Sequence, residues 1–268
     1  MTRKQSRDND IIINGLNIDD WLDEDNKVGN DEIDEISTLR YEKKLVAFLD
    51  LLGITEQVRS MIDGNEEEII SKMEKIKGIV EKEIQDIGKD DIQMLYISDS
   101  FIFVCEKDIL PNFLKLLSNI QMRILVECKT MLRGSVEYGD VIIRDQGKQI
   151  IGPAYISAYI NQEKYAIYPR IILSASVVEI ISEYDQTIIS QDREYSLDYF
   201  DVYKEIEGKS TRDLILRLKR EGVFKYLCDD YKKYSEKNNL SVKSKYAWTI
   251  NYLKNKGVWP NEKQYNCW

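Results

Sequence analysis

Two aspartates stand where apolar segments of the sequence meet polar residues. Asp50 follows the apolar run 45–49, and Asp99 lies between the mostly apolar runs 94–97 and 101–104. If these segments form neighbouring strands of one sheet, the two carboxylates converge. Carboxylate oxygens are the ligands that Mg²⁺ and Mn²⁺ prefer, and these ions in turn bind triphosphates. The pair therefore predicts a site for divalent cations and a phosphorylated substrate.

The sequence contains no histidine, and this absence excludes several kinds of catalytic site. A Ser-His-Asp triad, a Cys-His dyad and a His-ligated zinc centre all need an imidazole. What remains is carboxylate chemistry, Lys or Tyr chemistry, and the chemistry of hard cations with oxygen ligands. A cation site agrees with the missing histidines, because a bound metal ion activates an oxygen nucleophile without an imidazole base.

Composition sets further limits on the class of protein. The chain has 268 residues, 43% of them hydrophobic, and a net charge of −9, so we expect one main core and no electrostatic footprint for nucleic acid or an anionic membrane. No long apolar run or signal-peptide core is evident, which predicts a soluble, cytoplasmic protein. The four cysteines are widely spaced, which predicts reduced thiols and neither a disulfide framework nor a zinc site.

The order of the predicted elements favours an α+β fold. Apolar runs and helical periodicity predict a strand, a helix, a hairpin, a second helix and a strand at residues 44–52, 55–85, 92–105, 110–129 and 131–143. This order is the ferredoxin-like βαββαβ arrangement, in which both helices cover one face and the hairpin flanks the first strand. Asp50 and Asp99 are then neighbours. Further elements follow, a helix at 154–163 and a strand at 169–174.

We expect three parts along the chain. Residues 1–42 form an acidic arm that is flexible or contains a loosely docked helix, 43–200 form the core, and 201–268 form a mostly helical extension packed on the core. The extension is rich in Lys and Tyr, which is a composition also seen in nucleic-acid-binding segments. Acidic residues such as Asp229 and Asp230 interrupt it, which favours a solvated amphipathic helix instead.

The residues around Asp50 distinguish it from an ordinary strand-end aspartate, which most often caps a turn. Gly53 follows Asp50 by three positions, and helical sequence begins at Thr55. This spacing places a carboxylate, exposed backbone N–H groups and a helix start around one anion and its metal ion. The predicted phosphate contacts are Thr55 and the N–H groups of Gly53 and Ile54.

Other candidate substrate contacts come from cationic and aromatic side chains. A triphosphate needs additional positive charge, and Arg133, Lys164 and Arg170 are the nearest candidates in the predicted fold. Each has an alternative interpretation as a solvated or structural charge. Tyr96, beside Leu95, either lines a base pocket by stacking on the base or packs within the hairpin.

Several ordered segments resemble one protein family. Residues 48–55 (FLDLLGIT) and 97–100 (ISDS) resemble the two metal-binding motifs of class III nucleotidyl cyclases, and 133–139 (RGSVEYG) resembles the strand that follows them. Residues 152–163 and 168–171 are closer to a divergent bacterial branch that includes the pyrimidine cyclases of the Pycsar anti-phage systems.

The resemblance implies a nucleotide cyclase catalytic core with extra C-terminal strands and helices. Such an enzyme converts a nucleoside triphosphate, here UTP or CTP, into a 3′,5′-cyclic nucleotide (cUMP or cCMP) and pyrophosphate with two Mg²⁺ or Mn²⁺ ions. Asp50, Asp99 and the carbonyl of Leu51 would hold the ions. The resemblance also implies a homodimer with active sites at its interface. The product would be a second messenger for a separate effector in antiviral defence.

The sequence also departs from that family. Adenylate-type members carry a Lys four residues before the second metal-binding Asp, where this chain has Leu95. Their base-reading Asp and their transition-state Asn and Arg align near Gln149, Ile156 and Ile160. This loss fits a pyrimidine substrate, and it also fits inactivity. The alternative function is therefore a catalytically inactive nucleotide-binding or protein-interaction module on the same fold.

Overall fold

The computed structural model divides the chain into two units, Met1–Arg40 and Tyr41–Trp268. It describes residues 12–13, 16–17, 40–54, 66–87, 91–181, 188–191 and 194–267. In the first unit, β1 (Ile12–Ile13) pairs antiparallel with β2 (Leu16–Asn17). A docked helix is therefore the wrong interpretation at these four residues. The expected boundaries at 42/43 and 200/201 stay predictions.

Within the described residues, eight strands of the second unit form one sheet with the order β4-β5-β3-β6-β8-β10-β9, and β7 pairs with β6 beside this path. The strands are β3 (Glu42–Leu52), β4 (Ile92–Ile97), β5 (Ser100–Cys105), β6 (Met131–Arg144), β7 (Gln149–Ile151), β8 (Ile171–Leu173), β9 (Ile188–Gln191) and β10 (Glu194–Leu197). The β6–β8 pair is parallel, and the other pairs are antiparallel.

The predicted α+β fold is confirmed. Strand β3 lies between β5 and β6, and β4 borders β5, which is the ferredoxin-like order expected for βαββαβ. Strands β7, β9 and β10 were not individually predicted. They are only three or four residues long, so hydrophobic alternation gives them little signal.

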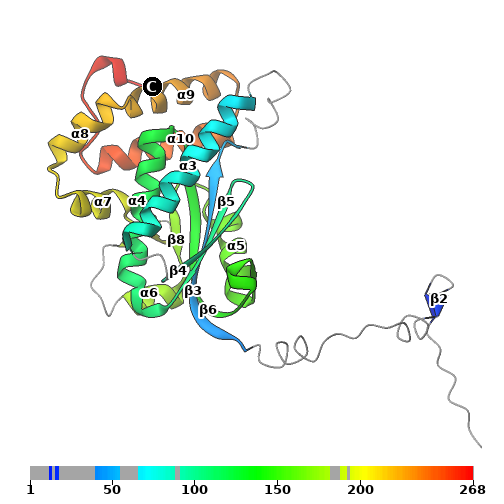
Figure 1. Ribbon diagram of the computed structural model, residues 1–268. Helices are drawn as coiled ribbons and strands as arrows, with labels where there is room; N and C mark the ends of the chain where they lie inside the picture. Colours follow the sequence, from blue (N-terminus) through cyan, green and yellow to red (C-terminus); the bar gives the residue numbers. More distant parts are fainter. Residues whose placement is uncertain are drawn as a thin grey trace, which may run out of the picture. The chain divides into compact units, whose positions relative to one another are not determined.

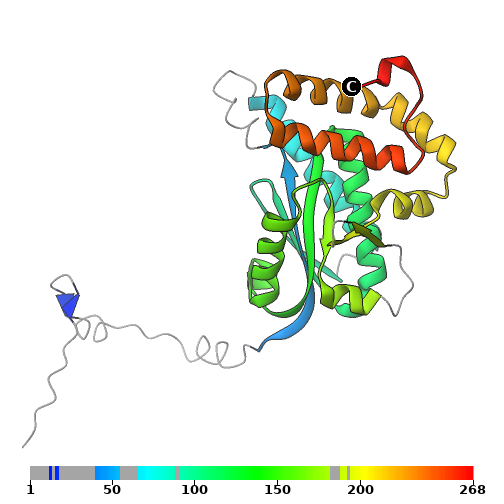
Figure 2. The same ribbon diagram turned by 180° about the vertical axis from the view of Figure 1, so that it is seen from behind.

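Helices cover both faces of this sheet. Helices α3 (Glu66–Ile87) and α4 (Leu110–Cys128) lie on one face, and α5 (Pro153–Tyr165) lies on the opposite face (Figures 1 and 2). Short helical segments complete the core: α6 (Ala175–Ile181) and the 3₁₀ turns Lys107–Ile109 and Asp145–Gly147. Along the described residues, no helix has the length and apolar character needed to cross a membrane.

The alternation of side chains along β3 determines on which face of the sheet the Asp50 side chain lies. Leu45 and Leu49 pack into the apolar cluster under α3 and α4, whereas Val46 and Phe48 pack against α5. Successive side chains of a strand point to opposite faces, so Asp50 shares the α5 side with Phe48.

The C-terminal extension forms a second apolar cluster on the core. Its helices are α7 (Tyr199–Glu207), α8 (Thr211–Arg220), α9 (Val223–Glu236) and α10 (Leu240–Asn255), followed by a 3₁₀ turn at Lys263–Tyr265. Their buried side chains pack with Met122, Leu125 and Met131 from α4 and the start of β6. The extension thus lies at the end of the sheet where β3 finishes (Figure 1).

The cysteines differ from the sequence-based expectation at two positions. Cys228 of α9 and Cys267 form a disulfide, with Cα atoms 5.0 Å apart. The prediction of reduced thiols is therefore wrong for this pair. The two cysteines are 39 positions apart in the sequence, and only the fold of the extension brings them together. Cys105 and Cys128 are buried free thiols.

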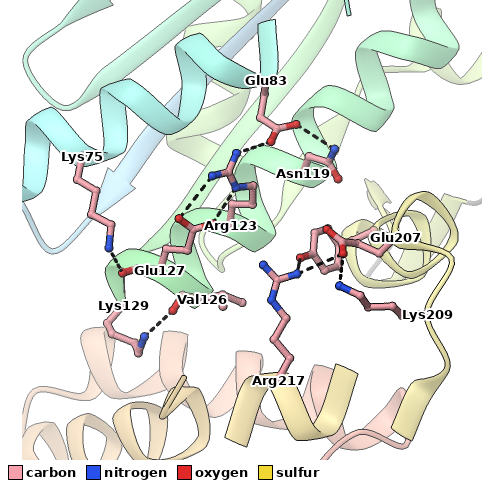
Figure 3. Close-up of polar contacts among 11 residues, drawn as sticks. Lys75, Glu83, Asn119, Arg123, Val126, Glu127, Lys129, Glu207, Lys209 and Arg217 are labelled. Carbon is pink, nitrogen blue, oxygen red and sulfur yellow. Dashed lines mark hydrogen bonds and ion pairs between the residues drawn. The ribbon is translucent and has the colours of Figure 1, made fainter. Parts of the chain in front are cut away.

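An ion-pair network joins α3 to α4. Arg123 of α4 donates from Nη1 to Glu83 Oε1 of α3 at 2.6 Å and from Nε to Glu127 Oε1 at 2.8 Å (Figure 3). Asn119 adds a bond to Glu83 at 3.0 Å, and Lys75 of α3 donates to the Glu127 carbonyl at 2.9 Å. Because Glu83 is buried, these bonds fix the two helices relative to one another.

Gly134 is expected to be intolerant of a side chain. A Cβ at this position would lie 2.7 Å from the Phe48 carbonyl oxygen and 2.3 Å from Leu49 Cδ2 on β3. We expect Gly134→Ala to lower the free energy of unfolding by about 1–3 kcal/mol, measured by urea denaturation. Gly139→Ala in the same strand is the control, since its Cβ would meet Ala154 Cβ at an acceptable 3.4 Å. Equal stability of the two variants would contradict the packing argument.

Candidate functional site

The structure brings Asp50 and Asp99 side by side. In the β3–β5 pairing, Asp50 is opposite Ser100, the residue directly after Asp99. Ser98 and Asp99 form the two-residue turn of the β4–β5 hairpin, closed by the pair Ile97 and Ser100. The backbone N–H of Leu51 donates to the Asp99 carbonyl at 3.1 Å. The hairpin tip is thus hydrogen-bonded to β3 next to Asp50.

The turn that carries Asp99 contains an unusual backbone conformation. Ser98 has φ of +56°, the left-handed region that non-glycine residues rarely adopt. Two-residue hairpin turns require positive φ because their twist must match that of the strands. The conformation costs of order 1 kcal/mol and is retained where the surrounding pairing fixes it. It places Asp99 at the hairpin tip.

Asp50 is held by side chains from a strand and a helix on its own side of the sheet. Arg133, its register partner on β6, donates from Nε to Asp50 Oδ2 at 2.9 Å. Gln162 of α5 donates from Nε2 to the same oxygen at 3.4 Å. The guanidinium of Arg133 also reaches the Ala166 carbonyl at 3.5 Å. The carboxylate is therefore oriented from two directions.

Burial dominates the electrostatics of Asp50. It raises the pKa of this carboxyl above its ordinary value, and the nearby Asp99 charge raises it further. The Arg133 hydrogen bond and charge, and the charge of Lys245, oppose this and lower the pKa in part. The net elevation means that ionised Asp50 is unfavourable in the folded chain, a common property of functional carboxylates.

This elevation predicts how Asp50→Asn changes stability with pH. A carboxyl whose pKa is higher in the folded state than in the unfolded state stabilises the fold at pH values below its unfolded-state pKa. This stabilisation is lost as the pH rises through its folded-state pKa. Near pH 7, the ionised carboxyl of wild type therefore lowers the free energy of unfolding, whereas the neutral amide of the variant does not. We expect Asp50→Asn to be at least as stable as wild type at pH 7 without divalent ions, with the advantage fading towards pH 4. Thermal unfolding at both pH values measures this. A variant less stable at pH 7 than at pH 4, relative to wild type, would contradict it.

The C-terminal extension also reaches this site. Burial and the charge of Arg133 lower the pKa of Lys245 on α10, and the charge of Asp50 opposes that shift. Trp248, one turn further along α10, stacks on Tyr168 of the core, with ring centroids 6.0 Å apart and planes at 6°. This contact docks α10 beside the residues that follow α5.

The predicted phosphate contacts fall at the end of β3. Gly53 is exposed and has φ of +86°, a conformation that glycine adopts without steric cost. Leu51 is buried in the strand, and Ile54 is buried just after Gly53. Thr55 lies outside the described residues. The contribution of these positions to binding stays a prediction.

The remaining candidate contacts lie in different environments. Tyr96 stacks on Phe101 with ring centroids 4.6 Å apart, which is the packing alternative for this residue. Lys164 is exposed at the end of α5. Arg170 is 4% exposed, and its Nη2 donates to the Tyr165 carbonyl at 3.5 Å. Of the three predicted cations, Arg133 is the one whose side chain is bonded to Asp50.

Gln162 and Lys245 were not predicted as site residues. Gln162 lies on α5 two residues after Ile160 and six after Ile156, the positions aligned with the transition-state residues, and no sequence pattern singled it out. Lys245 is far from Asp50 in sequence and belongs to a helix whose docking no local pattern specifies. Four positions align with the family residues that this chain lacks. Leu95 packs on the α5 side of the sheet, Gln149 and Ile156 are exposed, and Ile160 is half-buried.

The oxygen donors fit a hard divalent cation. Asp50 supplies a carboxylate from β3 and Asp99 supplies one from the adjoining β4–β5 turn, which is the donor chemistry that Mg²⁺ and Mn²⁺ prefer. Within the described ranges, no three His, Cys, Asp or Glu side chains gather into a metal-binding group. Ligands beyond the two carboxylates would therefore come from carbonyls, water or substrate phosphates, as is usual for Mg²⁺.

Comparison with known proteins gives structural similarity to adenylyl and guanylyl cyclase catalytic domains. No family model and no curated protein sequence matches the chain. A bacterial light-regulated adenylyl cyclase aligns over 63% of this chain and 98% of its own, at 16% identity and a TM-score of 0.47. The monomeric guanylyl cyclase domain of the RhoGC fusion protein from the aquatic fungus Blastocladiella emersonii aligns over 59% and 95%, at 14% identity and a TM-score of 0.49.

A third similar structure is the catalytic core of a rhodopsin-guanylyl cyclase with converted specificity in complex with ATPαS. It aligns over 57% of this chain and 87% of its own, at 17% identity and a TM-score of 0.47. Identities and scores of this size assign neither substrate nor activity to this chain.

Proposed function

We propose that the chain is a nucleotidyl cyclase that converts a nucleoside triphosphate into its 3′,5′-cyclic monophosphate and pyrophosphate. The observation that carries this proposal is the meeting of Asp50 and Asp99 at one sheet end, with Leu51 bonded to the Asp99 backbone. Cationic side chains converge on the same place, since Arg133 bonds Asp50 and the charge of Lys245 acts on it. This combination suits a substrate that carries several negative charges.

The reaction forms one bond and breaks one. The ribose 3′-oxygen bonds to the α-phosphorus, the bond from that phosphorus to the oxygen bridging to the β-phosphate breaks, and the hydroxyl proton passes to water or a phosphate oxygen. Two Mg²⁺ or Mn²⁺ ions would lower the pKa of the 3′-hydroxyl and neutralise the departing pyrophosphate. Asp50, Asp99 and the Leu51 carbonyl would hold them.

Arg133 has a proposed role in the same step. Its Nε donates to Asp50 Oδ2 at 2.9 Å, and its charge offsets that of the carboxylate. Metal ions held by Asp50 would offset the carboxylate charge instead, and the guanidinium would then offer its planar set of donors to a phosphate oxygen, which they suit well. Gln162 offers an uncharged amide donor from α5.

We further propose UTP or CTP as the substrate. The support is the loss of purine-reading groups: Leu95, where adenylate-type members carry a Lys, lies in an apolar setting on the α5 side of the sheet, and Gln149 stands near the position of their base-reading Asp. The product would be a second messenger read by a separate effector protein, in the manner of bacterial anti-phage signalling.

We also propose that the active form is a homodimer with its sites at the interface. The support is a group of large apolar side chains exposed on α5 and the strand before it. Ile151, Ile156 and Tyr159 are each 44–54% exposed. Exposed apolar residues that gather in this way commonly mark interfaces, and a two-fold interface buries the same patch on both subunits.

Incubation with each of the four ribonucleoside triphosphates and Mn²⁺ tests the function. Mass spectrometry should detect a cyclic monophosphate and pyrophosphate in equal amounts, with the largest yield from UTP or CTP. Light scattering on the same sample should give the mass of a dimer. Nucleotide binding without any cyclic product would overturn the enzymatic proposal in favour of an inactive nucleotide-binding module.

A further inference from the structure

A cavity of about 300 Å³ lies between the end of β3 and the C-terminal extension. Leu52, Gly53 and Met131 form its floor on the core side, and residues of α9 and α10 cover it. Leu52 and Gly53 follow Asp50 by two and three positions, so the cavity adjoins the proposed metal site. Its volume lies at the low end of small-ligand sites, which favours a compact ligand.

Lysines from four different elements line this cavity. They are Lys72 of α3, Lys129 at the end of α4, Lys233 of α9 and Lys245 of α10. Among the described residues, one carboxylate, that of Asp230, lines the same cavity, and it accepts a 2.8 Å hydrogen bond from the Tyr246 hydroxyl. A protein with a net charge of −9 therefore collects an excess of positive charge here. Like charges held together in a concave site create a field that attracts anions.

Two of these lysines are held where water is partly excluded. Burial lowers the pKa of Lys72 and of Lys129, although carboxylates such as Asp230 and Glu68 offset part of the shift at Lys72. Lys129 donates to the Val126 carbonyl at the end of its helix (Figure 3). Partial burial of an ammonium group is unfavourable, and an anion in the cavity would offset that cost.

The type of donor indicates which anion would fit. Lysine ammonium groups are compact point charges with rotatable donors, and they bind phosphates without demanding the planar geometry of an arginine pair. The Tyr226 hydroxyl, 3.3 Å from the Tyr246 hydroxyl that donates to Asp230, is a further donor at the cavity. Several lysines around a small volume suit an anion with several negative charges.

We propose that this lysine-lined cavity binds a polyphosphate group. Its source is either the phosphate tail of the nucleotide at the Asp50 site or a free inorganic polyphosphate. The first source rests on the proposed function, whereas binding of a free polyphosphate does not. In both cases the C-terminal extension supplies charge, through Lys233 and Lys245, to a site that the core completes with Lys72 and Lys129.

Calorimetric titration of the full chain with sodium tripolyphosphate, in EDTA, tests the proposal without any metal ion. Wild type should bind saturably, and the double variant Lys72→Met/Lys129→Met should bind at least about tenfold more weakly, because it keeps the aliphatic stems and loses two charges. Lys225→Gln is the matched control, since Lys225 is exposed on α9 and does not line the cavity. Its affinity should equal that of wild type. No binding by wild type, or equal weakening by the control, would overturn the proposal.

A competition experiment between tripolyphosphate and the nucleotide distinguishes the two sources of the polyphosphate group, the nucleotide's phosphate tail and a free inorganic polyphosphate. If the nucleotide tail occupies the cavity, tripolyphosphate should displace bound UTP or CTP, and the double variant should lose nucleotide affinity to a similar degree. If a free polyphosphate is the ligand, nucleotide binding should be unchanged in the double variant while tripolyphosphate binding falls. Absence of cyclic product in the enzymatic assay would refute the proposed function and would leave the tripolyphosphate result standing.

Discussion

Replacing Asp99 with asparagine is expected to reduce cyclic nucleotide formation by at least about a thousandfold. A cation bound at a reacting phosphate supplies several kcal/mol of transition-state stabilisation, and each 1.36 kcal/mol corresponds to a factor of ten in rate. Asp99 lies at the hairpin tip next to Asp50, so losing its charge removes one of the two carboxylates that would hold the ions. Asp50→Asn should have a similar effect, measured as the rate of product formation with Mn²⁺.

The matched control for Asp99 lies at the other end of the same hairpin. Asp91 precedes β4 and is exposed, and Asp91→Asn changes the net charge by the same amount as Asp99→Asn. Its activity should stay within about twofold of wild type, as expected for a surface position. Urea denaturation should show that the Asp99 variant is folded, because its side chain lies in a turn. An Asp99 variant that kept wild-type activity would contradict the proposed role of the carboxylate pair.

The largest stability loss is expected from Asp198→Ala, at about 3–5 kcal/mol. The side chain of Asp198 is 3% exposed and is paired with Lys256, the residue directly after α10. The Tyr252 hydroxyl donates to Asp198 Oδ1 at 2.6 Å and accepts from the Phe200 N–H at 3.0 Å. Removing the carboxylate leaves the buried Tyr252 hydroxyl without its acceptor and takes the buried partner away from the partly buried Lys256 ammonium, which keeps its pair with Asp201. A buried polar group is costly to leave unpaired. Urea denaturation gives the change in unfolding free energy.

Asp201 provides a matched control for this network. Its side chain is paired with the same Lys256 at 2.7 Å, but it is 41% exposed. Exposed ion pairs contribute little, so Asp201→Ala should cost less than about 1 kcal/mol. A stability loss for Asp198→Ala as small as that for Asp201→Ala would show that the contacts of Asp198 do not hold α10 in place. Since α10 carries Lys245, loss of these contacts should also weaken anion binding in the lysine-lined cavity.

The core of the fold could be predicted because its strands and helices have strong periodic patterns. The run around Asp50, the hairpin around Asp99 and the helix entered at Pro111 all have clear hydrophobic periods, and their order allows few topologies. The neighbourhood of Asp50 and Asp99 followed from that order. Their proposed roles, and those of Gly53 and Ile54, stay predictions.

Other features depend on tertiary contacts that local sequence does not encode. Gln162 reaches Asp50 through the orientation of α5, and Lys245 reaches it through the docking of α10. The disulfide between Cys228 and Cys267 likewise depends on how the extension folds back on itself. Arg133 was predicted as a phosphate contact. Its bond to Asp50 depends on the β3–β6 register, which places these two residues opposite one another.

Anomalous diffraction from crystals of the chain with Mn²⁺ and a non-hydrolysable UTP analogue would show whether Asp50 and Asp99 hold metal ions, because it locates the ions without reference to activity. We expect two Mn²⁺ peaks between the Asp50 and Asp99 carboxylates, with the triphosphate oxygens completing their coordination. Nucleotide bound elsewhere, or no Mn²⁺ at either aspartate, would contradict it.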